Sequence, residues 1–593
     1  MHAGLKAAGF LVVAGFVALA ATPGIAPKPP VAAPEQRVAQ ALLRPMTLRD
    51  RVAQLILAAA DAEPVSSTSK QFERYVHWVR DLHVGGVIIG TSVRDGQTRI
   101  AQPYATAILL NRLQRMSRIP LLVGSDFERG ASFRVDYTAR FPYNMAYGAA
   151  GDVEASRYEG LAAAREARAL GIHWIFAPDA DVNSNPENPI INIRSYGEDP
   201  DAVSRHVAAF IDGAHSDPQN LVLVTAKHFP GHGDTDTDSH LDMPRLNQDR
   251  EHMDAVELKP FEAAIAHGVD AIMTAHMSVP AIEPDDIPAT VSPKVLTGLL
   301  RKELKFQNLI ITDAMDMQGL TKEFSGAEAS VRAIMAGADV LLMPPDPERA
   351  IQAIVTAVLR GRIPRQRIDD SALRVLTAKV HLGLTRSKLV NVETVADVLD
   401  AKETAESAQR VSDRAITLVK NDGGMVPLQN ADHSCVIVAV QNRGSAAGNH
   451  FAQEFARRAR DARIVTVDAA MPEAALEAMV GDTSACSEIV VSANVAVAAY
   501  RGDVALGGDL APFLEKLTEG PAPVVMVAVG NPYLLASFPK VAAYLATFSV
   551  TAPSELSAVK ALFGQIPITG HMPVSIPGFA ALGDGIQMPA RTH

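Results

Sequence analysis

The segment 227–240 reads K-H-F-P-G-H-G-D-T-D-T-D-S-H and concentrates side chains that can move protons or hold ions. Three histidines and three alternating aspartates stand there beside two glycines and a proline. The segment follows an apolar run, residues 221–226, that is typical of a buried strand. Glycine and proline indicate an irregular backbone, and irregular loops on a rigid scaffold often carry chemistry. Residues 227–240 are therefore the first candidate for a functional site.

Solvation and metal binding are two interpretations of this segment. A solvated acidic loop would not need so many histidines. The aspartates begin like a calcium loop, but Ser239 stands where the turn glycine belongs, and Arg245 replaces the bidentate glutamate of the twelfth position. The three histidines match no standard zinc spacing. We therefore predict neither a metal nor another cofactor.

Acid–base chemistry is the third interpretation. In D-S-H, Asp238 precedes His240 by two residues. A carboxylate so close in the chain can orient the imidazole ring and stabilise its charged form, so the histidine can gain and lose a proton near neutral pH. The spacing therefore predicts that the two side chains act as a pair.

The elements that must position this pair form a repeating pattern over residues 45–385. Most of the apolar runs are separated by amphipathic segments of helical period, such as residues 154–170. The apolar runs are residues 55–60, 84–90, 120–127, 174–181, 221–229, 271–276, 309–313 and 340–343. Strand and helix alternating over this length predict an α/β fold, a (β/α)8 TIM-type barrel, with a doubly wound open sheet as the alternative.

Polar residues at the ends of these runs favour the barrel. They are Asp126, Asp179, Asp181, Lys227, His228, His276 and Asp313. Barrel enzymes build their active sites from the carboxyl-terminal ends of their strands, so these side chains are expected to converge on one face.

The motif K-H-F-P-G-H-G followed by D-S-H resembles the signature of glycoside hydrolase family 3, in its β-N-acetylglucosaminidase branch. The resemblance implies that Asp238 and His240 form the general acid/base dyad. It also implies that the aspartate ending L-I-I-T-D, Asp313, is the nucleophile, with Asp316 as the alternative carboxylate.

The resemblance extends to a set of substrate-binding residues. They are Asp126, Arg134, Arg194, Lys227 and His228. The segment 125–134 resembles a sugar-binding motif of the family, although Arg129 and Ala131 depart from its pattern. Asp181 and Asn183 are either further sugar ligands or residues that brace their own loop.

A second domain is expected after the barrel. Residues 386–414 read as a linker helix, and residues 415–593 read as an α/β sandwich with parallel strands at 436–440, 489–493, 524–529 and 541–546. Segments 530–532 and 570–575 resemble the family's second domain. This domain either contributes to the active site or only packs against it. Whether Cys435 and Cys486 pair is left open by the sequence.

The beginning of the chain predicts export. Lys6 precedes an apolar run, residues 7–21, with small residues after it, which is typical of a signal peptide over residues 1–26. A retained anchor is the alternative. Residues 27–44 read as a linker, extended where Pro and Ala dominate. We expect a periplasmic or secreted protein without stable membrane insertion after cleavage.

The resemblance implies an exo-acting β-N-acetylglucosaminidase that removes terminal N-acetyl-β-glucosamine from peptidoglycan- or chitin-derived oligosaccharides through a covalent glycosyl-enzyme. A β-glucosidase or mixed-specificity glycosidase is one alternative, and a glycan-binding protein without catalysis is another. The net charge of −11 gives no basic surface for nucleic acid, so an oligosaccharide is the expected partner. The oligomeric state is left open.

Overall fold

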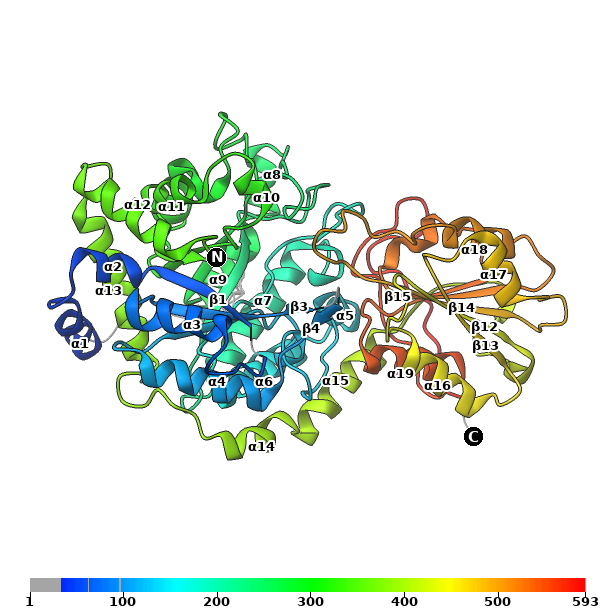
Figure 1. Ribbon diagram of the computed structural model, residues 1–593. Coiled ribbons are helices and arrows are strands. Elements are labelled where there is room, and N and C mark those ends of the chain that lie inside the picture. Colours follow the sequence, from blue (N-terminus) through cyan, green and yellow to red (C-terminus); the bar gives the residue numbers. More distant parts are fainter. Residues whose placement is uncertain (1–32, 62, 95–96, 592–593) are drawn as a thin grey trace, which may run out of the picture.

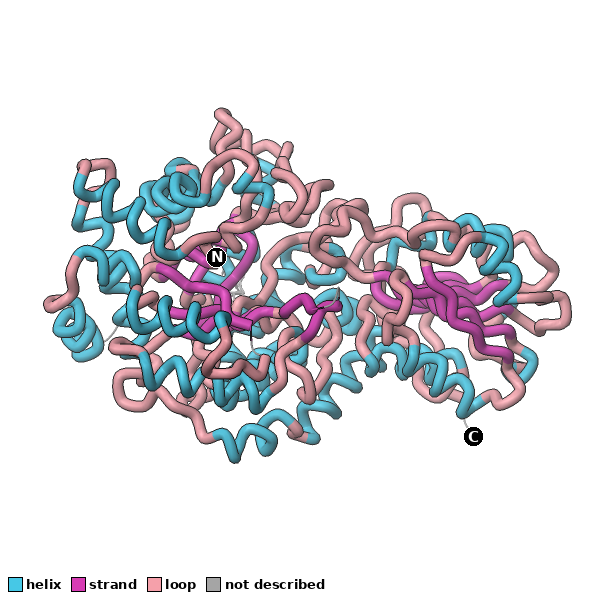
Figure 2. The backbone as a smooth tube through the Cα atoms, viewed as in Figure 1, coloured by secondary structure: helices cyan, strands magenta, loops and turns pink. Residues whose placement is uncertain are grey.

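The computed structural model describes residues 33–61, 63–94 and 97–591. The predicted signal peptide, residues 1–26, lies outside these residues. The described chain forms two bodies, each built around its own sheet, and a helical segment runs along one side of both (Figures 1 and 2). None of the described helices is long and apolar enough to cross a membrane.

The first body is built on a sheet of eight parallel strands, and each strand lies within one of the apolar runs or within two residues of it. The strands are β1 (Ile56–Asp61), β2 (Gly86–Gly90), β5 (Leu122–Ser125), β6 (Trp174–Ile175), β7 (Leu223–Phe229), β8 (Ala271–Thr274), β9 (Leu309–Thr312) and β10 (Leu341–Leu342). Their order in the sheet is β10-β1-β2-β5-β6-β7-β8-β9. A parallel bridge between Ile311 and Val340 joins the two ends of the sheet. The predicted barrel is therefore confirmed, and the open sheet is wrong.

Helices surround the barrel strands, as the amphipathic segments predict. They are α2 (Leu48–Ala53), α3 (Lys70–Val76), α4 (Pro103–Met116), α5 (Asn144–Ala150), α6 (Val153–Leu170), α7 (Pro200–Ala214), α8 (Arg250–Ala255), α9 (Lys259–Ala266), α10 (Gln318–Thr321), α11 (Gly326–Ala336), α12 (Pro347–Leu359) and α13 (Arg365–His381). In α6, the Asp152 side chain accepts the Ala155 N–H at the start, and Gly171 ends the helix in the left-handed conformation. A short hairpin of β3 (Ser92–Arg94) and β4 (Gln97–Arg99) extends from the barrel.

Residues before the barrel differ from the prediction. The segment expected to be extended contains helix α1 (Ala33–Leu43). Ala39 of α1 is fully buried and lies in a small apolar cluster with Met46 and with Leu376 of α13. The helix forms because burial of this face against α13 outweighs the extended preference of the preceding Pro-rich chain.

Two helices connect the barrel to the second body, where the sequence predicts one linker helix. They are α14 (Val395–Leu399) and α15 (Lys402–Ala415). Helix α15 has a strongly amphipathic sequence and buries Ala408 and Val411 against the barrel core. Residues 402–415 thus pack on the barrel instead of spanning solvent (Figure 1).

The second body is a six-stranded sheet with helices on both faces, as predicted. Its strands are β11 (Thr417–Asn421), β12 (Cys435–Val440), β13 (Arg463–Asp468), β14 (Ile489–Val495), β15 (Val524–Gly530) and β16 (Ala543–Ala546). The order is β11-β16-β15-β14-β12-β13, parallel except for β11. The sequence prediction missed β11 and β13, which are the two edge strands. Edge strands lack the continuous apolar character of strands buried on both faces, as the partly exposed β13 illustrates.

Two pairs of helices cover the two faces of this sheet (Figure 1). They are α17 (Glu473–Val480) with α18 (Leu510–Leu517), and α16 (Asn449–Arg458) with α19 (Ala552–Leu562). Alternate residues of β12 divide between the faces, Ile437 packing with α17 and α18 and Val438 with α16 and α19. Cys435 and Cys486 form a disulfide at the start of β12 and just before β14.

The two bodies share an apolar and hydrogen-bonded interface. Met145 and Ala146 of α5, in the barrel, belong to the buried cluster under α17 and α18. The Glu198 carboxylate accepts hydrogen bonds from the Ser575 backbone N–H at 2.7 Å and from its hydroxyl at 2.5 Å. The Tyr533 hydroxyl accepts a hydrogen bond from Asn183 Nδ2 at 2.9 Å. The second body therefore packs directly on the loops at the carboxyl ends of the barrel strands.

Candidate active site

The carboxyl-terminal ends of β5 to β9 bring together the polar residues that the sequence singles out. Asp126 follows β5, and Asp179 and Asp181 follow β6. Lys227 and His228 are among the last three residues of strand β7, His276 follows β8, and Asp313 follows β9 directly. Because neighbouring parallel strands end at the same edge of the sheet, residues far apart in sequence become neighbours here.

Lys227 is the centre of a buried charge network. Its ammonium group lies 2.9 Å from Asp126 Oδ1 and 2.7 Å from Glu128 Oε1. Arg134 Nη2 donates to the other oxygen of Asp126 at 2.6 Å. Burial would raise the pKa of Asp126, but Lys227 and Arg134 outweigh it and lower this pKa to about 2. Burial also opposes the charge of Lys227, yet Asp126 and Glu128 raise its pKa above the ordinary value, so both groups stay ionised.

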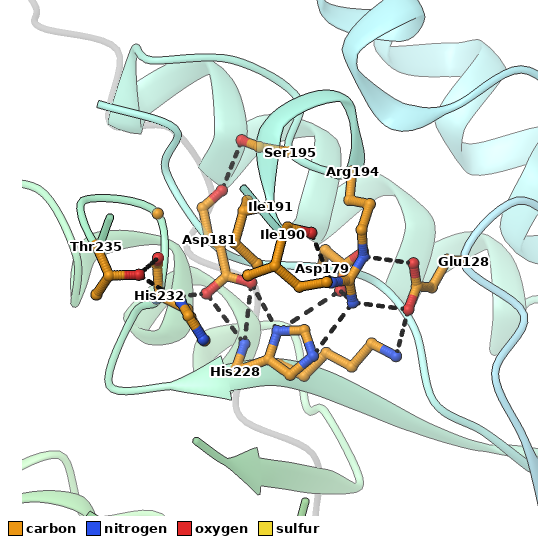
Figure 3. A network of polar contacts seen from close by, with 12 residues as sticks. Glu128, Asp179, Asp181, Ile190, Ile191, Arg194, Ser195, His228, His232 and Thr235 are labelled. Carbon is orange, nitrogen blue, oxygen red and sulfur yellow. Dashed lines mark hydrogen bonds and ion pairs between the residues drawn. The ribbon is translucent and has the colours of Figure 1, made fainter. Parts of the chain in front are cut away.

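Arg194 makes the second half of the network (Figure 3). Its Nε and Nη2 bind both oxygens of Glu128, at 2.8 and 2.9 Å. The paired geometry is the strongest that arginine makes with a carboxylate. Nη1 also donates to the Ile190 carbonyl at 2.9 Å, and Nη2 lies 3.3 Å from His228 Nε2. Arg194 is therefore held in one orientation with its side chain only 11% exposed.

Asp181 fixes the loop that carries the site. Its carboxylate accepts from His228 Nδ1 at 2.8 Å and from the His232 backbone N–H at 2.7 Å. These contacts brace the segment 228–232. Within this segment Gly231 has a φ of 126°, a conformation that favours glycine. Asn183 contacts Tyr533 and the Asn185 carbonyl. Both residues thus make bracing contacts, one of the two roles that the sequence leaves open.

Asp179, Asp181 and His228 form a cluster whose donor atoms lie within 4.8 Å of one another, a spacing that could hold a metal ion. His228 Nδ1 is already bonded to Asp181, and Arg194 Nη2 lies 3.6 Å from Asp179 Oδ1. Burial and the neighbouring Glu128 raise the pKa of Asp179 to about 7. With a fixed guanidinium supplying positive charge beside Asp179, and with His228 bonded to Asp181, the cluster fits a network of ion pairs and hydrogen bonds better than a bound cation.

Asp238 and His240 form the pair that their spacing predicts. His240 Nδ1 lies 2.8 Å from Asp238 Oδ1, and the same oxygen accepts the His240 backbone N–H at 2.9 Å. The Asp238 side chain is fully buried, whereas that of His240 is 24% exposed. Burial raises the pKa of Asp238, but the hydrogen bonds from His240 outweigh it and lower this pKa below its usual value. The carboxylate is thus ionised and the imidazole edge stays accessible.

Asp313 follows β9 directly and is close enough to His240 for the imidazole to affect its ionisation. Its Oδ1 accepts the Ala314 N–H at 2.7 Å. Burial would raise the pKa of Asp313, but the nearby imidazoles of His228, His276 and His240 and the Ala314 N–H lower it. The alternative carboxylate, Asp316, has the opposite shift, because burial and the charge of Asp313 raise its pKa. Asp313 is therefore the carboxylate that stays ionised more readily.

The loop carrying Asp238 and His240 is tied to the segment that follows Asp313. The Gly319 N–H donates to the Ser239 carbonyl at 3.1 Å, and a side chain at Gly319 would lie about 3 Å from that oxygen, which is tighter than usual packing. Lys322 also pairs with Asp242 at 3.1 Å. The loop with Asp238 and His240 and the segment after Asp313 are therefore held in a fixed position relative to each other.

Comparison with known proteins shows the family to which the chain belongs. The model of the glycosyl hydrolase family 3 N-terminal domain matches residues 47–378. The chain belongs to glycosyl hydrolase family 3. Its match spans the barrel that carries the residues described above, and membership shows that the protein is a glycoside hydrolase.

One relative and one solved structure extend the match beyond the barrel. A protein of Cellulomonas fimi named β-N-acetylglucosaminidase/β-glucosidase is 30% identical over 518 residues, which is 84% of this chain and 89% of that protein. β-Hexosaminidase A of Pseudoalteromonas piscicida is 33% identical over 58% of this chain and 61% of its own length. The structure of a family 3 β-N-acetylglucosaminidase from Paenibacillus sp. FPU-7 is 31% identical, with a TM-score of 0.80 over 90% of this chain and 99% of that one.

Two site features were missed by the sequence analysis. Glu128 lies in the segment 125–134 but was not among the predicted site residues, although it accepts from both Lys227 and Arg194. Its position two residues after Asp126 was the available signal, since alternate positions in an extended chain can face one site. The second feature is Tyr500 of the second body, whose N–H donates to Asp238. No sequence pattern indicates this contact, because the two residues are 262 positions apart.

Proposed function

We propose that this family 3 hydrolase is an exo-acting β-N-acetylglucosaminidase that retains the anomeric configuration. The observation that carries the proposal is the Asp238–His240 pair, bonded at 2.8 Å and tied by Gly319 to the segment after Asp313. The names of the relatives from Cellulomonas fimi and Paenibacillus support the choice of sugar. Terminal N-acetyl-β-glucosamine of peptidoglycan- or chitin-derived oligosaccharides is the proposed substrate, and cell wall turnover is the proposed setting.

In this mechanism Asp313 attacks the anomeric carbon and forms a glycosyl ester while the bond to the leaving oxygen breaks. His240 gives its proton to that oxygen, then takes a proton from the water that hydrolyses the ester. Asp238 holds the imidazole and stabilises its charged form. The lowered pKa of Asp313 supports its role, because only the ionised carboxylate can attack.

The buried charge network is proposed to bind the sugar in the subsite next to Asp313. Asp126 and Lys227 would hold hydroxyl groups, and His228 and Arg194 would contact the ring or its substituents. Arg134, which stacks on Phe133 and binds Asp126, would help to hold the acylamino group. Because these groups are fixed by one another before substrate arrives, they lose little freedom on binding.

The sugar preference can be measured directly. We expect kcat/KM for a nitrophenyl N-acetyl-β-glucosaminide to exceed that for the matching β-glucoside by at least about tenfold, a difference of roughly 1.4 kcal/mol. The printed name of the Cellulomonas fimi relative makes measurable β-glucosidase activity the second candidate. Equal or reversed preference would favour a β-glucosidase or mixed enzyme, and no turnover of either would favour glycan binding alone.

We also propose that the protein is exported to the periplasm or the medium. Two observations support this: the apolar run over residues 7–21 and the Cys435–Cys486 disulfide, since disulfides persist mainly in oxidising compartments. Expressed from its own leader in a bacterial host, the protein should leave the cytoplasm shortened by roughly twenty to twenty-six residues. N-terminal sequencing and fractionation test this, and a mature chain that still begins at Met1 would contradict cleavage.

A further inference from the structure

A loop of the second body lies over the Asp238–His240 pair. The loop follows β14 and contains residues 498–503. The Tyr500 backbone N–H donates to Asp238 Oδ2 at 2.9 Å, the only hydrogen bond to this oxygen within the described part of the chain. The other oxygen, Oδ1, is taken by the two bonds from His240. The buried carboxylate therefore has both oxygens satisfied only with the second body in place.

The ring of Tyr500 contacts the other member of the pair. Its centroid lies 5.1 Å from that of the His240 imidazole, with the planes at 63° in an edge-to-face arrangement. Such pairs are attractive at this distance and orient the two rings. The tyrosine is nevertheless 57% exposed, so packing in a core does not explain its position.

The backbone conformation of Tyr500 is itself unusual. Its φ is 66°, in the left-handed region that is uncommon for residues other than glycine. This conformation allows the N–H and the ring of one residue to reach the two members of the pair together. Two residues later, a side chain added at Gly502 would meet Leu241, the neighbour of His240, at 3.1 Å. The loop and the barrel thus approach each other closely.

The loop is held from its own side by side chains of the second body. Arg501 Nη2 donates at 2.6 Å both to Gln441 Oε1, beyond the end of β12, and to the Ala505 carbonyl. Asn531 Nδ2 donates to the Val504 carbonyl at 2.8 Å, and its Oδ1 accepts from Asn192 of the barrel at 3.3 Å. The position of Tyr500 is therefore set by the fold of the second body.

We propose that Tyr500 is a positioning residue for the acid/base pair, so that the second body completes the active site of the barrel. Its main chain fixes the Asp238 carboxylate, and its ring fixes the His240 imidazole that Asp238 holds. The proposal rests on the proposed acid/base role of His240. It assigns the second body a part in the chemistry without adding a proton-transferring group.

The test separates steps that need His240 from those that do not, using aryl N-acetyl-β-glucosaminides whose leaving groups range from dinitrophenol to a weakly acidic phenol. In Tyr500→Ala we expect kcat/KM to fall by roughly tenfold or more for the poor leaving group and by less than about threefold for dinitrophenol. Tyr500→Phe keeps the ring and should restore the wild-type dependence. Arg501→Ala, which loosens the loop without touching the pair, should show a smaller loss of the same kind.

Two controls keep the outcome clear. Tyr104→Ala removes an exposed tyrosine on α4, outside the site, and should change neither rate. His240→Ala, measured on the same substrates, tests the proposed function itself. A Tyr500→Ala enzyme that is equally impaired on all leaving groups, or that matches wild type while His240→Ala is impaired, would overturn the positioning role of the ring. Because alanine keeps the backbone N–H, the main-chain role is tested by Arg501→Ala, and a wild-type result there would overturn it. A His240→Ala enzyme without leaving-group dependence would instead refute the acid/base role on which the proposal rests.

Discussion

Replacing Asp313 by asparagine is expected to abolish turnover, with kcat reduced by roughly four to six orders of magnitude, as for other enzymes that lose their nucleophile. A neutral amide cannot attack the anomeric carbon to form the glycosyl ester. The fold should survive, because the asparagine carbonyl can still accept the Ala314 N–H that Asp313 Oδ1 accepts at 2.7 Å. Steady-state rates beside thermal unfolding curves measure both expectations.

The matched control is Asp316→Asn, three residues along the same loop. Its carboxyl has a raised pKa, so it is less available as an ionised nucleophile, and its loss should cost less than about tenfold. A second test uses Asp313→Gly with azide and an activated substrate. If Asp313 is the nucleophile, azide takes its place and gives the α-glycosyl azide. Activity of Asp313→Asn within tenfold of wild type, or collapse of Asp316→Asn instead, would assign the role elsewhere.

Replacing His240 by alanine is expected to separate the two chemical steps. Release of an activated phenol needs no proton, so the glycosyl-enzyme should form at nearly the wild-type rate. Its hydrolysis loses the base that activates water and should slow by about 10²–10⁴-fold. Stopped-flow measurement should therefore show a burst of phenol followed by a slow steady rate. Added azide, which needs no base, should restore turnover and give the β-glycosyl azide.

Asp236→Asn is the matched control in the same loop. Asp236 is exposed and bonds only the Thr237 hydroxyl among the side chains described, so its loss should leave both steps unchanged. Equal slowing of both steps in His240→Ala would mean that the histidine has a structural role. A structural defect would slow the formation and the hydrolysis of the glycosyl-enzyme alike. Absence of azide rescue would point the same way.

The fold was predictable from sequence because the strands and helices of both the barrel and the sandwich produce regular patterns of apolar residues. Strands buried on both sides, such as the fully buried β12, read as continuous apolar runs, and the helices between the strands are amphipathic. Edge strand β13 escaped prediction because one side of it faces solvent. Helix α1 escaped because its stability comes from packing on α13, which local composition does not report.

The contacts in the candidate site are likewise of two kinds, those between residues close in sequence and those between residues on different strands. Asp238 and His240 stand two residues apart, so their contact is local and the sequence alone predicts it. The convergence of Asp126, Lys227 and Asp313 follows once the strands are assigned to a barrel, because every parallel strand ends at the same face. Their roles remain predictions that the substitutions above test.

The sequence by itself thus determined the two fold types, the polar residues at the strand ends and the contact between Asp238 and His240. Only the tertiary structure decided which partners these residues have across long stretches of chain. Cys435 and Cys486 meet because β12 and β14 are neighbours in the second sheet, with Cys435 in register with Ile489. Tyr500 reaches Asp238 only because the second body docks on the strand-end loops of the barrel. Such contacts depend on the relative placement of whole elements, and no local pattern of residue types encodes that placement.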